Sequence, residues 1–164
     1  MKVLHVAGPS GAGKTRLIEA LLPSLPVAWV IKWTHHPIGQ DKPGSDTDRL
    51  SLGGTPTILA GPDGLVARWA LGNRSLLYEY MARMLPDDAL VVIEGHHADS
   101  HPKVWIGSDP PPSSALVIGP AAQGDSHWLT AALPLTDKDI INASDFLRHH
   151  YQRYLYTIGR DAHE

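Results

Sequence analysis

A glycine-rich pattern near the start of the chain limits its fold more than any other feature of the sequence. Residues 8–15 read GPSGAGKT and fit G-x-x-x-x-G-K-[ST], the pattern of a phosphate-binding P-loop. The apolar run at 3–7 predicts a buried strand before the loop, and residues 17–22 predict a helix after it. In this arrangement, backbone N–H groups and the helix dipole converge on a phosphate. We therefore expect the chain to bind a nucleoside triphosphate.

The P-loop pattern also assigns chemistry to single side chains. Lys14 is expected to reach the β- and γ-phosphates and is a candidate catalytic residue, and the Thr15 hydroxyl is expected to hold Mg²⁺. The predicted nucleotide-binding residues are those of the loop and the residue after it: Gly8, Pro9, Ser10, Gly11, Ala12, Gly13, Lys14, Thr15 and Arg16.

Length and composition exclude several classes of protein. At 164 residues and 43% apolar content, the chain is predicted to form a single P-loop nucleotide-binding domain over 1–164. The formal net charge of −3 leaves no broad basic surface, so nucleic acid is not an expected partner. Cysteine is absent, which excludes disulfides and thiolate metal sites. With no apolar run of about 18 residues and no room for a signal peptide before the first strand, we expect a cytoplasmic protein without a membrane partner.

The remaining apolar segments predict an α/β fold. Strands are expected at 27–33, 57–60, 65–69, 89–93, 104–106 and 115–118. Apolar positions at helical spacing predict helices over 76–85 and 140–155, and a short helix is expected at 50–52. We predict a P-loop NTPase-like, mostly parallel sheet flanked by helices, with one antiparallel hairpin around residues 61–64.

Glu94 is the strongest candidate for further chemistry outside the loop. It follows the run at 89–93, whose continuous apolar character predicts an interior parallel strand. Ligands bind beyond the carboxyl ends of such strands, so Glu94 is predicted to hold Mg²⁺ or to orient an attacking water. The alternative is a solvated carboxylate at the end of a strand.

The polar loop over 34–48 offers two further metal candidates. Asp41 and Asp46 follow the second predicted strand, the region that in P-loop GTPases folds over the γ-phosphate and Mg²⁺. The alternative is a surface loop that holds turn residues and a helix cap at Asp48.

Two further patterns have plainer explanations. Histidines occur in pairs at 35–36, 96–97 and 149–150, but their spacing is not typical of a metal site, so loop histidines without a metal are favoured. The segment 136–139, TDKD, has the wrong order for the guanine-reading N-K-x-D motif, and a capping box from Thr136 to Asp139 is favoured. The residues alone therefore do not choose between guanine and adenine.

Four blocks spread over residues 1–147 resemble the molybdopterin-guanine dinucleotide biosynthesis protein B (MobB) family. Besides the P-loop, Ile31-Lys32 with the histidines and D-K-P-G-S-D that follow is similar to that family's I-K-H-x-H-H…D-x-D-K-P-G-K-D-S. Glu94-Gly95 followed by the P-K-V at 102–104 is similar to its E-G-F-K…P-K-I, and K-D-I at 138–140 to its D-D-I. Trp33 stands where the family usually has His, and His96-His97 replaces Phe-Lys.

The resemblance implies a GTP-binding adaptor with weak, Mg²⁺-dependent GTPase activity. Such a protein would assist the attachment of a guanine nucleotide to molybdopterin, beside the guanylyltransferase MobA. Two other classes stay open: a small-molecule kinase built on the same loop, and a nickel-handling GTPase metallochaperone suggested by the histidine pairs. Scattered Lys and Arg residues disfavour the first, and the missing cysteines disfavour the second.

The resemblance also implies a homodimer. The strands at 65–69 and 104–106 each carry a tryptophan and are expected to be exposed edges that pair across a two-fold axis. The alternative is that Trp69 and Trp105 pack inside one domain.

Overall fold

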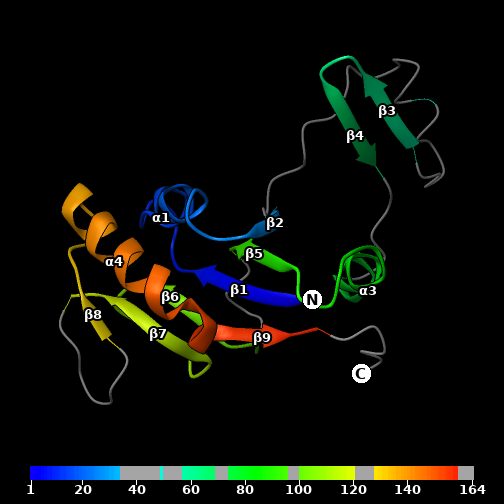
Figure 1. Cartoon of the computed structure of the whole chain (residues 1–164). Coiled ribbons are helices and arrows are strands. Elements are labelled where there is room, and N and C mark those ends of the chain that lie inside the picture. Colours follow the sequence, from blue (N-terminus) through cyan, green and yellow to red (C-terminus); the bar gives the residue numbers. More distant parts are fainter. Residues whose placement is uncertain (34–48, 50–56, 69–73, 96–99, 121–127, 159–164) are drawn as a thin grey trace.

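A mostly parallel sheet organises the chain (Figure 1). The computed structural model describes residues 1–33, 49, 57–68, 74–95, 100–120 and 128–158. Within these residues, a 7-stranded sheet has the order β2-β5-β1-β6-β7-β8, and β9 pairs with β1. The strands are β1 (Lys2–Ala7), β2 (Val27–Lys32), β5 (Leu90–Glu94), β6 (Lys103–Ile106), β7 (Ser114–Gly119), β8 (Trp128–Thr130) and β9 (Leu155–Thr157). Among the described strands of this sheet, β9 alone runs antiparallel to its neighbour. The predicted fold class is confirmed.

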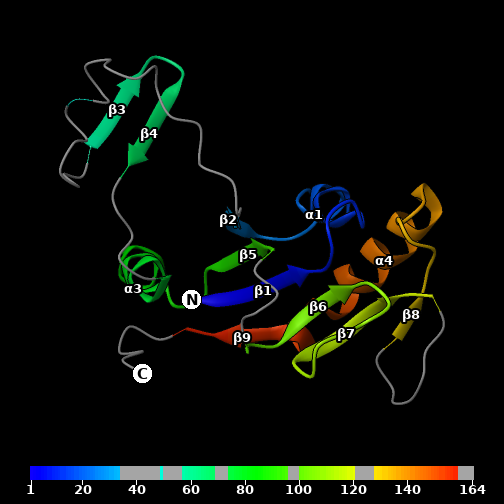
Figure 2. The same cartoon turned by 180° about the vertical axis from the view of Figure 1, so that it is seen from behind.

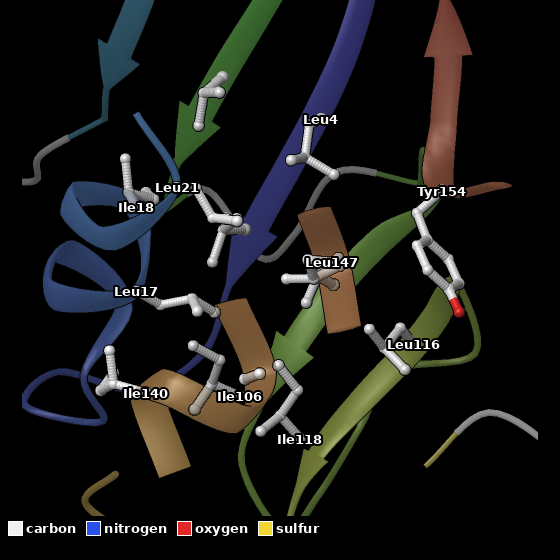
Figure 3. Close-up of a cluster of buried hydrophobic side chains, with 14 of the residues drawn as sticks. Leu4, Leu17, Ile18, Leu21, Ile106, Leu116, Ile118, Ile140, Leu147 and Tyr154 are labelled. Atoms are coloured by element: carbon white, nitrogen blue, oxygen red, sulfur yellow. The ribbon is translucent and has the colours of Figure 1, made fainter. Parts of the chain in front are cut away.

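Helices cover both faces of this sheet because alternate residues of its strands point to opposite sides. Leu4 and Val6 of β1 belong to one core with α1 (Lys14–Leu21) and α4 (Asp137–His150). Val3 belongs to a second core with α3 (Arg74–Met84). Figure 3 shows the first core, where helices α1 and α4 meet strands β1, β6 and β7. The core side chains labelled there include Leu4, Leu17, Ile18, Leu21, Ile106, Leu116, Ile118, Ile140 and Leu147.

The interior position of β5 explains its continuous apolar sequence. It lies between β2 and β1, and all five of its residues, Leu90–Glu94, are buried. Leu90 and Val92 enter the first core, and Val91 and Ile93 enter the second. This confirms the predicted interior strand.

The predicted antiparallel hairpin is also confirmed. Strands β3 (Thr57–Gly61) and β4 (Gly64–Arg68) pair with each other as a separate two-stranded sheet within the described residues. The hairpin stands away from the large sheet in both views (Figures 1 and 2), and Leu65 and Val66 are exposed.

The predicted exposed edge at 104–106 is wrong. Strand β6 pairs with β1 on one side and β7 on the other, so both of its edges are occupied. Trp105 is buried with Ala7 and Val117 in a small third cluster, which is the alternative that the sequence left open.

The end of the chain differs from the single helix expected over 140–155. Helix α4 ends at His150, the 3₁₀ helix η2 (Tyr151–Tyr154) turns the chain, and β9 pairs with residues Lys2 to Leu4 of β1. Strand β9 can pair with this edge of β1 because, in the described residues, β6 pairs only with Val6 and Ala7 there. The predicted helix is therefore present up to His150, and the end of the apolar stripe, at Leu155, lies in a strand that completes the sheet.

Two other expectations concern residues that the structure does not describe. The short helix expected at 50–52 and the tryptophan at position 69 lie outside the described residues. None of the helices in the described ranges combines the length and the apolar character needed to cross a membrane.

Helix α4 begins with the capping box that the sequence favoured. The Thr136 hydroxyl accepts the backbone N–H of Asp139 at 3.2 Å, and the Asp139 carboxylate accepts the backbone N–H of Thr136 at 3.0 Å. Hydrogen bonds from the Thr136 hydroxyl, and next from its backbone, lower the pKa of Asp139 below its ordinary value of 3.8.

We predict that Thr136→Ala lowers the free energy of unfolding by about 1 kcal/mol at neutral pH, because a first-turn N–H loses its acceptor. A carboxyl group whose pKa is lowered by folding stabilises the folded protein at pH values above its ordinary pKa. This stabilisation is lost as the pH falls through the pKa that the group has in the folded protein. The difference between variant and wild type should therefore narrow below about pH 4. Urea unfolding at neutral and acid pH measures the loss and its pH dependence, with Ile141→Ala, at an exposed position of the same helix, as the control. An equal loss in both variants would contradict the cap.

Candidate functional site

The P-loop lies between β1 and α1 and is held by close backbone contacts. Gly8 has φ +146°, and a Cβ there would lie 2.2 Å from the carbonyl oxygen of Ile106. Gly13, the N-cap of α1, has φ 105°, which is the left-handed region. The loop therefore needs glycine at both positions, and it presents the N-terminal end of α1 to a ligand.

Lys14 folds back over this loop. Its Nζ donates to the carbonyl oxygen of Pro9 at 2.6 Å. Burial is the main cause that lowers the pKa of Lys14 below its ordinary 10.5; the charge of Glu94 raises that pKa in part, and the charge of Lys32 lowers it further. A lysine that is partly desolvated and close to a second cation gains most from a bound anion, so this environment suits a phosphate.

Three side chains meet beside the loop, at the carboxyl ends of β2 and β5. The Thr15 hydroxyl donates to Glu94 Oε1 at 2.9 Å. Lys32 Nζ lies 3.3 Å from the same carboxylate oxygen and 3.4 Å from Thr15 Oγ1. The side chain of Glu94 is only 8% exposed, so it is not the solvated strand-end carboxylate that the sequence left as an alternative.

Gly95, the residue after Glu94, fixes the end of strand β5. Gly95 has φ +93°, its N–H donates to the carbonyl of Val6 at 2.9 Å, and a Cβ there would lie 3.0 Å from the carbonyl oxygen of Trp33. The Nε2 atom of His5, a fully buried residue, lies 2.5 Å from the Gly95 carbonyl oxygen. These contacts clamp the strand end, so the carboxylate of Glu94 is held against Thr15.

Arg16 turns toward another part of the molecule. Its guanidinium donates to the carbonyl of Leu135 at 3.1 Å and forms an ion pair with Asp137, at the start of α4. The backbone N–H of Leu135 in turn donates to the carbonyl of Ala12 at 3.2 Å. In this arrangement Arg16 ties the P-loop to the segment before α4, and a contact of Arg16 with nucleotide stays a prediction.

Several predicted metal candidates are not placed by the structure. Asp41, Asp46 and the histidines at 35–36 and 96–97 lie outside the described residues. His149 and His150 lie at the end of α4, where His149 Nδ1 approaches the carbonyl of Asp145 at 2.8 Å. In the described part of the chain, no group of three or more His, Cys, Asp or Glu residues is arranged to hold a metal ion.

Lys32 is the site residue that the sequence analysis did not assign. The sequence did contain an indication of its role, because Lys32 is a charged residue at the carboxyl end of a predicted strand, where ligands bind. The register of the sheet places Lys32 directly beside Glu94. That register is a tertiary property, so the sequence alone did not bring the two together.

The donor set fits Mg²⁺ in its chemistry. Thr15 offers a hydroxyl oxygen and Glu94 offers carboxylate oxygens, and these lie beside the loop that would hold phosphates. Mg²⁺ in nucleotide sites takes one or two protein oxygens and completes its shell with water and phosphate. These two residues are therefore sufficient as protein ligands.

Comparison with known proteins identifies the family. The family profile described as MobB, molybdopterin guanine dinucleotide synthesis protein B, matches residues 3–118. The chain belongs to the MobB family. The molybdopterin-guanine dinucleotide biosynthesis adapter protein of Haemophilus influenzae is 34% identical, over 63% of this chain and 62% of that protein. The Escherichia coli protein of the same description is 31% identical, over 65% of this chain and 66% of that protein. The match thus spans slightly less than two thirds of either relative.

Solved structures support the same fold. The crystal structure of Bacillus subtilis MobB superposes with a TM-score of 0.62 at 20% identity, covering 94% of this chain and 98% of that one. A second crystal structure of molybdopterin-guanine biosynthesis protein B gives a TM-score of 0.60 at 18% identity, covering 92% and 99%. At these identities the likeness shows the MobB fold, and the residues of the site rest on the contacts described above.

We predict that the pKa of Lys14 lies below 10.5 in the free protein and rises when a polyphosphate binds. The reason is that a bound anion favours the charged lysine and offsets its burial. Heteronuclear NMR of the lysine side chains during a pH titration, with and without inorganic triphosphate, measures the change. Lys2, exposed at the start of β1, is the internal control; equal shifts at both lysines would contradict a specific phosphate contact.

Proposed function

We propose that this chain is an adapter of molybdopterin-guanine dinucleotide biosynthesis that binds Mg²⁺ and GTP and hydrolyses the nucleotide slowly. The two bacterial relatives carry the name of such an adapter. The observation that carries the nucleotide part is the meeting of the P-loop, the half-buried Lys14 and the Thr15–Glu94 pair at one edge of the sheet. Guanine rather than adenine follows from the family alone.

Each residue of the site has a distinct task in this proposal. The backbone N–H groups of the loop and the charge of Lys14 bind the phosphates. Thr15 and Glu94 offer oxygens to Mg²⁺, with Asp41 or Asp46 as further candidates. Bound Mg²⁺ would supply charge neutralisation at the phosphates. Glu94 would also orient a water near the terminal phosphate.

Slow hydrolysis follows from what the site lacks in the described residues. Fast P-loop GTPases use an arginine finger and a glutamine that positions water. Within the described ranges, Arg16 is the arginine next to the loop, and its guanidinium is engaged by Leu135 and Asp137. An adapter that holds GTP for long periods suits a role beside a guanylyltransferase, the MobA-type partner that the family resemblance implies. The kinase and nickel-handling alternatives gain no observation in their favour.

The nucleotide proposal predicts Mg²⁺-enhanced binding of GTP that is lost in Lys14→Ala without loss of folding. Calorimetry with GTP, GDP, ATP and ADP, each with Mg²⁺ and with a chelator, tests it, and Lys2→Ala is the matched control. Phosphate release by the wild type should stay below about 1 s⁻¹, the lower end of kinase turnover. Tight ATP binding without GTP binding would reject the guanine assignment, and unchanged affinity in Lys14→Ala would reject the P-loop assignment.

We also propose a homodimer, formed by the hairpin and the β2 side of the large sheet. Strand β2 pairs with β5 and leaves its other edge open in the described residues. Trp29 on β2 is 50% exposed and Leu65 on the hairpin is 69% exposed. Apolar side chains beside an open strand edge are typical of a surface that a second copy covers.

Light scattering should therefore give a mass near twice 17.8 kDa. The substitutions Trp29→Asp and Leu65→Asp should shift the protein toward the monomer, because they place charges on the apolar surface. Ile141→Asp is the control, since Ile141 is 65% exposed, close to Leu65, but lies on α4. A wild-type monomer at micromolar concentration would reject the dimer, and a dimer unaffected by the first two variants would reject this surface.

A further inference from the structure

Lys32 lies against both of the oxygens that the proposed function assigns to Mg²⁺, which are themselves 2.9 Å apart. Its ammonium is 3.3 Å from Glu94 Oε1 and 3.4 Å from Thr15 Oγ1. It therefore lies where a cation held by Thr15 and Glu94 would lie. The charge of Lys32 also compensates that of Glu94, whose side chain is 8% exposed and whose strand end is clamped by Gly95.

A lysine ammonium and Mg²⁺ cannot share this position. Two cations within a few ångströms repel, and the repulsion is stronger beside a buried carboxylate than in water. Glu94 is held in place, whereas the Lys32 side chain is 61% exposed and carries its charge on a flexible stem. The lysine is thus the member of the pair that can move away.

We propose that Lys32 is an internal counter-ion that holds the divalent-cation position in the free protein and leaves it when Mg²⁺ and a triphosphate bind together. This inference rests on the proposed nucleotide-binding function. A triphosphate adjacent to the loop gives the displaced ammonium a new anionic partner. Mg²⁺ alone offers no such partner and must compete with Lys32 for Glu94.

The consequence is a coupling between metal and nucleotide. In the free protein, Lys32 weakens the binding of a divalent cation. With a triphosphate present, that penalty is relieved, so each ligand strengthens the binding of the other. Lys32 is a positioning residue in this scheme, because it acts through the occupancy of Thr15 and Glu94.

The test measures metal binding without nucleotide and without turnover. Mn²⁺ is the probe, because electron paramagnetic resonance counts the free ion. Lys32→Met removes the charge and retains the apolar stem, and it should bind Mn²⁺ alone up to about fivefold more tightly than the wild type, as expected for removal of one partly screened cation. Lys2→Met, at the opposite end of the strands, should match the wild type.

Two further variants keep the result decisive. Adding Glu94→Gln to Lys32→Met should abolish the gained Mn²⁺ affinity, which places the ion at this site. Lys32→Gln, with a polar neutral side chain, should repeat the gain if Lys32→Met folds poorly, as circular dichroism would show. In calorimetry, the ratio of triphosphate affinity with Mg²⁺ to that with a chelator should fall by the same factor, up to about fivefold, in Lys32→Met.

The outcomes separate the inference from the proposed function. Equal Mn²⁺ affinity in wild type, Lys32→Met and Lys32→Gln would overturn the counter-ion assignment, even if the wild type binds Mg²⁺ and GTP. A variant that loses triphosphate affinity equally with and without Mg²⁺ would also overturn it, since Lys32 would then be a plain phosphate ligand. A wild type that binds no nucleotide would reject the proposed function. The Mn²⁺ affinities of wild type and variants would still test whether Lys32 competes with a cation for Glu94.

Discussion

The parallel register of β1 and β5 is the constraint on which the site depends. It pairs Val6 with Glu94, so the strand that leads into the P-loop ends beside the strand that carries the carboxylate. Strand β2 continues the same register and brings Lys32 next to Glu94. The first turn of α1 then lies over these strand ends, which brings the Thr15 hydroxyl within 2.9 Å of the carboxylate. A shift of one residue in either pairing would turn these side chains to the opposite face of the sheet.

Two glycines at the ends of β1 and β5 allow the backbone to pass very close to neighbouring strands in this register. Gly8 passes the carbonyl of Ile106, and Gly95 passes the carbonyl of Trp33, both with positive φ. Each glycine lies directly where a strand ends and the site begins. Glycine adopts such a backbone conformation without a steric penalty, so the chain can pass this close and leave the neighbouring side chains in the site. The buried His5 contacts the Gly95 carbonyl and so further fixes this end of β5.

The charges of the site are unbalanced in a way that suits an anion. Lys14 and Lys32 contribute two positive charges, and Glu94 contributes one negative charge, within one small region. Burial already disfavours the charged form of Lys14, so the free site holds a positive charge that is partly desolvated. A phosphate relieves this, and a divalent cation alone does not. Under the proposed function, the arrangement would couple the binding of phosphate to a rearrangement of cations around Glu94.

Local sequence patterns determined much of this protein. The P-loop, the hairpin at 61–64, the interior strand before Glu94 and the capping box at Thr136 depend on residues close together in the chain, so spacing and residue type were enough to predict them. The tertiary structure decided what depends on distant partners. It buried the strand with Trp105 between β1 and β7, and it placed Leu155–Thr157 as a strand beside β1. It also directed Arg16 to Asp137 and brought Lys32 into contact with both Thr15 and Glu94. The physical reason is that strand neighbours and their register follow from long-range pairing, which no local spacing encodes.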